Sequence, residues 1–170
     1  STQSRLWGPI MGSTYYTQLS HWSKGEFSNA NNLQDDLGII TSEIYGVGYK
    51  DDDHGNDTSS ASVLLTNEQG LLQTNTGIIE RNTDLDLFKF HSGAGSLDIT
   101  LDPYEYKPNL DAKLELLDSN GTVVSSSDPI HIGSPHLATT VVAGTYYLRV
   151  DGVGYLSALN TGYSDYGSLG

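Results

Sequence analysis

Residues 110–152, LDAKLELLDSNGTVVSSSDPIHIGSPHLATTVVAGTYYLRVDG, decide the fold of this chain. Apolar and polar residues alternate along this stretch in short runs. Such alternation is typical of a strand with one buried face, because successive side chains of a strand point to opposite sides of the sheet. The pair Asn120-Gly121 separates two of the runs and favours a type I′ hairpin turn, which needs positive φ at both central residues. The stretch therefore predicts antiparallel strands joined by tight turns.

The same texture continues upstream to about residue 49. Glycine and proline residues interrupt it at short intervals, as they do at turns. We expect strands at residues 62–66, 77–81, 85–91, 96–101, 112–118, 122–127, 137–142 and 145–151. Short strands without long helices between them predict a mainly β fold, specifically an antiparallel two-sheet β-sandwich that resembles a jelly roll.

Residues 1–48 differ in composition and are predicted to form a separate extension, with the sandwich occupying residues 49–170. Aromatic residues and amides are frequent in the extension. Leu33, Leu37 and Ile40 have the spacing of one helical face, and they follow amide residues suited to an N-cap. We expect one short helix here in an otherwise irregular segment.

The composition limits the classes of function. The 170 residues include 8 basic and 21 acidic ones, which gives a formal net charge of −13. Such a surface repels nucleic acids and anionic membranes, so we expect neither as a partner. The chain has no cysteine, which excludes disulfides and thiolate chemistry. No segment approaches the roughly 20 apolar residues of a membrane span.

Acidic residues are concentrated in two places, the run DDDHGND at residues 51–57 and the pair Asp84 and Asp86. The pair shares one face at the start of a predicted strand. Calcium prefers six to eight oxygen ligands, which carboxylates, amides and a flexible loop can supply. Many carboxylates close together are costly without a cation. The cluster predicts a calcium site, and a solvated acidic loop is the alternative.

Three motifs resemble the bacterial pre-peptidase C-terminal domain, a β-sandwich appended to secreted hydrolases. They are NTDLDLFKF at residues 82–90, NLDAKLELLDSNG at 109–121 and AGTYYLRVDG at 143–152. The resemblance implies a secreted, extracellular module of a bacterial hydrolase with a tethered catalytic domain. It also implies calcium where an acidic leader meets the Asp-x-Asp strand. Its ligands would then be Asp52, Asp53, Asn56, Asp84 and Asp86.

The front segment, WGPIMGSTYYTQLSHWSKGEF at residues 7–27, resembles the end of a metzincin-type zinc protease domain. Met11 would fill the place of the methionine turn. The metal-binding pattern His-Glu-x-x-His does not occur in the sequence, so we expect no zinc proteolysis by this chain. Neither a Gly-x-Ser-x-Gly motif nor a phosphate-binding loop occurs, and we expect no enzymatic activity. The first residues lack the features of a signal peptide, and we expect the chain to be part of a longer protein.

Tyrosine is the commonest aromatic residue, with 11 Tyr against three Phe and two Trp. Tyr104 and Tyr106 lie two residues apart in a segment bounded by prolines, and Tyr163 and Tyr166 lie near a predicted loop. Flat amphipathic rings beside acids and amides are suited to stacking on sugars, and they also suit fibrous proteins such as collagen. We interpret these four residues as candidates for ligand binding. Ordinary rim tyrosines of a sandwich are the alternative.

Together these patterns predict a non-catalytic, calcium-stabilised accessory module of a secreted bacterial hydrolase. An extracellular polysaccharide is the favoured ligand, held by weak contacts that a tethered catalytic domain strengthens through avidity. A collagen- or protein-binding domain of a secreted metalloprotease is one alternative. An export or maturation domain is another.

Overall fold

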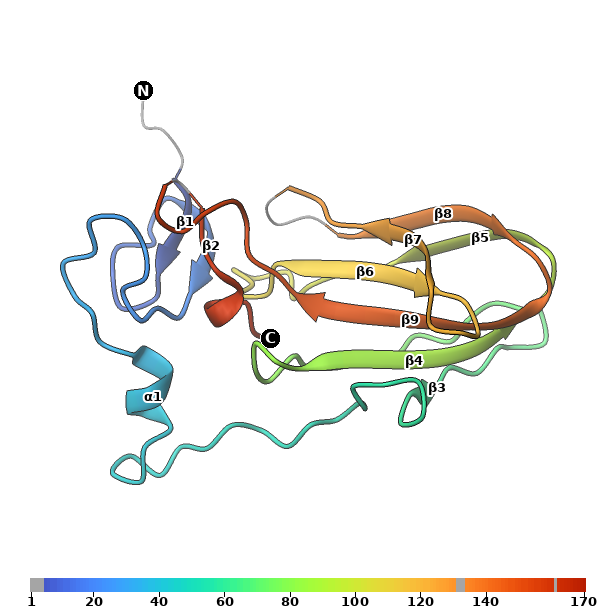
Figure 1. Cartoon of the computed structure of the whole chain (residues 1–170), viewed down its shortest axis with the longest axis horizontal. Helices are drawn as coiled ribbons and strands as arrows, with labels where there is room; N and C mark the ends of the chain where they lie inside the picture. Colours follow the sequence, from blue (N-terminus) through green and yellow to red (C-terminus); the bar gives the residue numbers. More distant parts are fainter. Residues whose placement is uncertain (1–4, 131–133, 161) are drawn as a thin grey trace.

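The computed structural model describes residues 5–130, 134–160 and 162–170. Its main body is a β-sandwich, as predicted (Figure 1). One sheet has five strands in the order β3-β4-β9-β6-β7, and a smaller sheet pairs β5 with β8. The strands of the two sheets are β3 (Ser62–Val63), β4 (Leu85–Ser92), β5 (Gly95–Thr100), β6 (Ala112–Leu117), β7 (Val123–Ser127), β8 (His136–Val141) and β9 (Gly144–Gly152).

Strand β9 is the centre of the larger sheet. It pairs antiparallel with β4 on one side and with β6 on the other. Its sequence GTYYLRVDG combines aromatic and β-branched residues, which fit a pleated and largely buried surface. The exception to the antiparallel prediction is β3, which runs parallel to β4 at the edge of the sheet.

The core lies between the two sheets. Alternate residues of β4, β6, β8 and β9 point into it, as the period of a strand requires. The most buried of them include Phe90, Leu114, Leu116 and Leu137, each at most 2% exposed. The alternation found in residues 110–152 therefore does mark the buried face.

The turn at Asn120-Gly121 forms, but as a different type from the one predicted. The N–H of Asp118 donates to the carbonyl of Thr122 at 2.8 Å, which closes a loop of three residues. Gly121 has a φ of 80°, whereas Asn120 does not have a positive φ. This is a type I turn with the glycine in the left-handed position, the usual solution for a three-residue hairpin loop.

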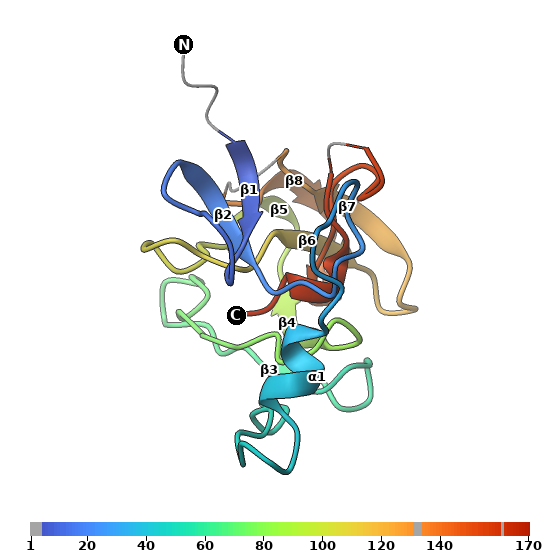
Figure 2. The same cartoon turned by 90° about the vertical axis from the view of Figure 1, so that its left-hand side faces the viewer.

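The N-terminal extension contains a small sheet that the sequence did not predict. Strands β1 (Arg5–Pro9) and β2 (Thr17–His21) pair in parallel. Figure 2 shows this sheet in front of the end of the sandwich, with the helix α1 (Asp36–Ile40) below it. The domain division at residue 48 stays a prediction.

The helix is shorter than predicted and begins later. Its N-cap is Asp35, whose Oδ1 accepts from the N–H of Gly38 at 2.7 Å, so a carboxylate replaces the expected amide. Leu33 lies before the helix and is exposed. Neither α1, with five residues, nor the other helix in the described ranges has the length and apolar character needed to cross a membrane.

Residues 77–81 do not form the predicted strand. Ile79 instead exchanges two backbone hydrogen bonds with Gly170, at 2.9 and 3.0 Å. The C-terminal tail, which includes the short 3-10 helix η1 (Asp165–Gly167), thus supplies the pairing that a neighbouring strand would have supplied. A hydrogen bond from the N–H of Glu80 to Oδ2 of Asp84, at 3.1 Å, holds residues 77–81 beside the start of β4.

Candidate functional site

Three of the predicted metal ligands meet at the start of β4. Asp84 lies in the turn before the strand, Asp86 is its second residue, and Asp52 comes from the segment that runs alongside. Each offers a carboxylate oxygen within 4.8 Å of the other two. Asp84 and Asp86 share a face because they are two positions apart along an extended backbone.

Backbone contacts hold the acidic segment against β4. The N–H of Leu87 donates to the carbonyl of Gly55 at 3.1 Å, and the N–H of Leu85 donates to Oδ1 of Asn56 at 2.5 Å. The side-chain amide of Asn56 also donates to Asp52 at 3.1 Å. Asn56 therefore positions Asp52, and its Oδ1 already accepts one hydrogen bond.

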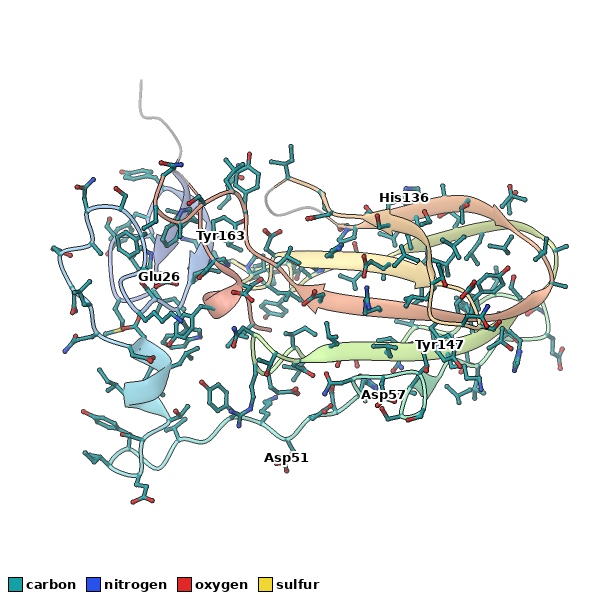
Figure 3. All side chains as sticks on the ribbon, in the orientation of Figure 1. Glu26, Asp51, Asp57, His136, Tyr147 and Tyr163 are labelled. Carbon is teal, nitrogen blue, oxygen red and sulfur yellow. The ribbon has the colours of Figure 1, made fainter. Side chains whose placement is uncertain are left out.

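Asp53 lies at the margin of the cluster. Its Oδ1 accepts from the N–H of Ile78 at 3.3 Å and lies 3.9 Å from Nε2 of His54. Its negative charge still acts on the buried carboxyls, since it is one of the charges that raise the pKa of Asp86. Asp51 points away from the sheet into solvent and takes no part (Figure 3).

Glu80 is a member of the cluster that the sequence analysis missed. Its side chain is 6% exposed, and its backbone N–H donates to Oδ2 of Asp84 at 3.1 Å. The turn at residues 81–83 brings these two residues together, with the N–H of Asp84 bonded to the carbonyl of Arg81 at 3.0 Å. The available signal was an acid four residues before Asp84 in an otherwise apolar run, which is unusual for a buried strand.

Several oxygens of these buried carboxyl groups lack hydrogen-bond partners. Both side-chain oxygens of Glu80 and one oxygen each of Asp84 and Asp86 form no hydrogen bond, although all are inaccessible to solvent. None of the ion pairs among the described residues joins them to a lysine or arginine. Buried carboxylates without a partner are costly, and proteins usually avoid them unless a cation is bound.

The electrostatics agree with this geometry. Burial raises the pKa of Asp86 to about 8, and the neighbouring charge of Asp84 adds to the effect. Burial also raises the pKa of Glu80, and the neighbouring carboxyl group of Asp84 adds to the effect. The site thus gathers carboxyl groups that no basic side chain compensates and that resist ionisation. Its donors are all oxygens on a loop and a strand end, a set that fits a hard divalent cation such as calcium.

Gly77 forms one wall of the site. A Cβ at this position would stand 2.4 Å from Oδ2 of Asp86 and 2.8 Å from the ring of His54. A side chain there would displace the carboxylate, so the close packing of the backbone depends on glycine. The ring of His54 is itself fixed, with Nδ1 2.7 Å from the hydroxyl of Ser62 and Nε2 2.8 Å from the carbonyl of Thr76.

Two of the four candidate tyrosines are exposed, and the other two are partly or fully buried. Tyr104 and Tyr106 are 73% and 68% exposed, and their ring centroids lie 5.8 Å apart at 65°. Tyr166 is half-buried, with its hydroxyl bonded to Asp35, and burial raises its pKa.

Tyr163 is buried, which does not fit the ligand-binding role predicted for it. It is 3% exposed, and its hydroxyl donates to Oδ2 of Asp111 at 2.6 Å. Its ring packs edge-on against His21 and Trp7, with centroids 4.5 and 5.8 Å apart. Figure 3 shows it at the junction between the extension and the sandwich. No face of this ring remains for a ligand, because the N-terminal extension covers it.

Met11 lies in the turn after β1 and is 74% exposed. The resemblance of its segment to the methionine turn of zinc proteases stays a prediction.

Comparison with known proteins finds distant similarity to solved structures. No family model matches the chain, and no curated protein matches it. One matching solved structure is that of CBM51-2 in complex with GlcNAc and INT domains from Clostridium perfringens ZmpB, with 16% sequence identity and a TM-score of 0.34. The match covers 75% of this chain and 31% of that one. A similarity this distant transfers neither a site nor a ligand.

Proposed function

We propose that this chain is a non-catalytic, calcium-stabilised binding module of a secreted bacterial hydrolase, and that it binds an extracellular polysaccharide. The observation that carries the calcium part is the set of buried, unpaired carboxylate oxygens on Asp84, Asp86 and Glu80. These side chains are 2–6% exposed, and carboxylate oxygens of Asp84 and Asp86 lie within 4.8 Å of one of the exposed Asp52. A bound cation would remove the cost of burying them.

Asp52, Asp84 and Asp86 would hold the ion, with Glu80 as a further oxygen donor. Calcium supplies charge compensation and joins the acidic segment to β4. Asp53 would add to the negative potential that attracts the ion, and Asn56 would orient Asp52. This arrangement favours a structural role for the metal, because the donors come from segments that the ion would tie together.

The binding part of the proposal rests on the exposed pair Tyr104 and Tyr106. Exposed tyrosine rings offer flat apolar faces to the C–H faces of sugars, with hydroxyls free for polar contacts. The net charge of −13 disfavours anionic polymers, so an uncharged polysaccharide is the expected ligand. Individual contacts of this kind are weak, and attachment to a catalytic domain would raise the effective affinity.

The first experiment combines metal removal with a polymer pull-down. Calcium is expected to raise the melting temperature of the protein, and EDTA to reverse the gain. Asp84→Ala combined with Asp86→Ala should remove this response, whereas Asp51→Asn, in the same acidic segment but directed into solvent, should keep it. An unchanged melting curve in EDTA would show that calcium does not stabilise the protein, and would refute the proposed metal site.

The pull-down uses microcrystalline cellulose, chitin, insoluble xylan and collagen fibrils, each with calcium and with EDTA. Retention on a polysaccharide supports the proposed function. Retention on collagen alone favours the protein-binding alternative. Failure to bind any of the polymers refutes the binding module and leaves the export or maturation role.

A further inference from the structure

Two loops with exposed tyrosines lie side by side at the end of the sandwich. One is the connection between β1 and β2, where Tyr15 is 86% exposed. The other is the segment between β5 and β6 that carries Tyr104 and Tyr106. The two loops are about 90 residues apart in sequence, and one belongs to the N-terminal extension while the other belongs to the sandwich.

Lys107 connects the loops directly. Its Nζ donates to the carbonyl of Thr14 at 3.2 Å, which places the neighbours Tyr15 and Tyr106 on adjoining segments. The same carbonyl also accepts from the N–H and the hydroxyl of Thr17, at 3.2 and 3.0 Å, so the loop of Tyr15 has a defined turn. Lys107 itself has a φ of 47°, a conformation uncommon outside glycine that persists where the surroundings fix it.

A second contact supports the same arrangement. The hydroxyl of Ser20 in β2 donates to Oδ1 of Asn109 at 2.9 Å. Figure 2 shows the segment between β5 and β6 reaching the side of the molecule where β2 lies. Thr14, just before β2, and Ser20, within β2, thus both contact the segment that carries Tyr104 and Tyr106.

We propose that Tyr15, Tyr104 and Tyr106 form a single binding face for an uncharged polysaccharide chain, assembled from both the extension and the sandwich. This inference rests on the proposed function and extends it. The rings of Tyr104 and Tyr106 are inclined at 65° and cannot both lie flat beneath one sugar ring. They would contact successive sugars of a chain, and Tyr15 would contact a sugar further along it.

Lys107 is a positioning residue in this arrangement. Its ammonium group is used in the contact with Thr14, and it holds the loop of Tyr15 beside the other two rings. The net charge of −13 disfavours anionic polymers as ligands.

The test measures depletion isotherms on the polysaccharide that retains the parent protein. Tyr15→Ala and Tyr104→Ala are each expected to weaken binding by about tenfold, the effect of losing one well-packed aromatic contact. Tyr45→Ala is the matched control, since Tyr45 is 62% exposed in the turn after α1, away from both loops. Its binding should equal that of the parent. All three substitutions are at exposed positions and should leave the melting temperature unchanged.

The role of Lys107 is tested by a double-mutant cycle with Lys107→Met and Tyr15→Ala. Lys107→Met should weaken binding in the parent and have little effect once Tyr15 is absent. An equal loss in both backgrounds would overturn the positioning role.

The outcomes separate this inference from the function on which it rests. If Tyr104→Ala weakens binding while Tyr15→Ala binds like the parent, the composite face is wrong and the proposed function stands. If the parent binds collagen alone or no polymer, both are overturned.

Discussion

Substituting Asp86 by asparagine should change stability in opposite directions with and without calcium. Burial raises the pKa of this carboxyl from its ordinary value of 3.8 to about 8. At pH 7 the native protein therefore holds a proton that the unfolded chain has released. The metal-free native state loses about 1.4 kcal/mol for each pH unit between these two points. The loss at pH 7 amounts to about 4 kcal/mol.

The sign follows from the direction of the shift. An acid whose pKa is raised on folding destabilises the native state as the pH rises from about 4 to about 8. Asparagine cannot ionise, so Asp86→Asn removes this loss. In EDTA at pH 7 the variant should be more stable than the parent by up to about 4 kcal/mol, or about 10 °C in melting temperature for a chain of this size. With calcium the order should reverse. The parent has the Asp86 carboxylate to bind the ion and is stabilised by it, whereas the variant lacks this carboxylate.

The assay is thermal and denaturant unfolding at pH 5, 7 and 8, in EDTA and in saturating calcium. The difference between parent and variant in EDTA should be smallest at pH 5. Asp51→Asn provides the control, since this exposed residue should respond to neither condition. The reasoning is refuted if Asp86→Asn is the less stable protein in EDTA at pH 7, or if calcium raises both melting temperatures equally.

Three further predictions concern individual positions. Gly77→Ala should weaken calcium binding at least tenfold by titration calorimetry, because its Cβ would stand 2.4 Å from the carboxylate of Asp86, whereas Gly48→Ala, which meets no atom within 4 Å, should bind normally. Burial lowers the pKa of His21 from 6.5 to about 4. With calcium present, the parent should therefore lose stability relative to His21→Leu as the pH falls through this interval. A difference in the free energy of unfolding that stays constant with pH would exclude the effect. Tyr163→Phe should lower the free energy of unfolding by about 1–3 kcal/mol, since a buried carboxylate loses its donor, yet leave polymer retention intact. Reduced retention by the folded variant would restore the ligand-binding role of this tyrosine.

Much of the fold could be predicted because strand patterning is local. Seven of the eight predicted strands correspond to β3–β9, with ends that differ by a few residues. The failure at residues 77–81 is also informative. That segment has the apolar pattern of a strand, and Ile79 is 1% exposed, but its backbone partner is the C-terminal residue Gly170 and no strand. Burial was predictable there, and the pairing was not.

The candidate metal site was predictable in part for the same reason. Asp84 and Asp86 share a face through strand geometry alone. Glu80 joins them only because of the turn that follows it, and the contacts of Asn56 with Leu85 and Asp52 arise only in the folded chain. The identity of the ion and the extracellular setting stay predictions.

By itself the sequence determined the β class of the fold, the faces of its strands and the pairing of Asp84 with Asp86, since each follows from the two-residue period of an extended chain. Only the tertiary structure decided which tyrosines are available. Tyr163 is buried beneath the N-terminal extension, whereas Tyr104 remains exposed beside the loop of Tyr15. What distinguishes the two is the docking of distant segments, which depends on packing and hydrogen bonds that no local pattern encodes.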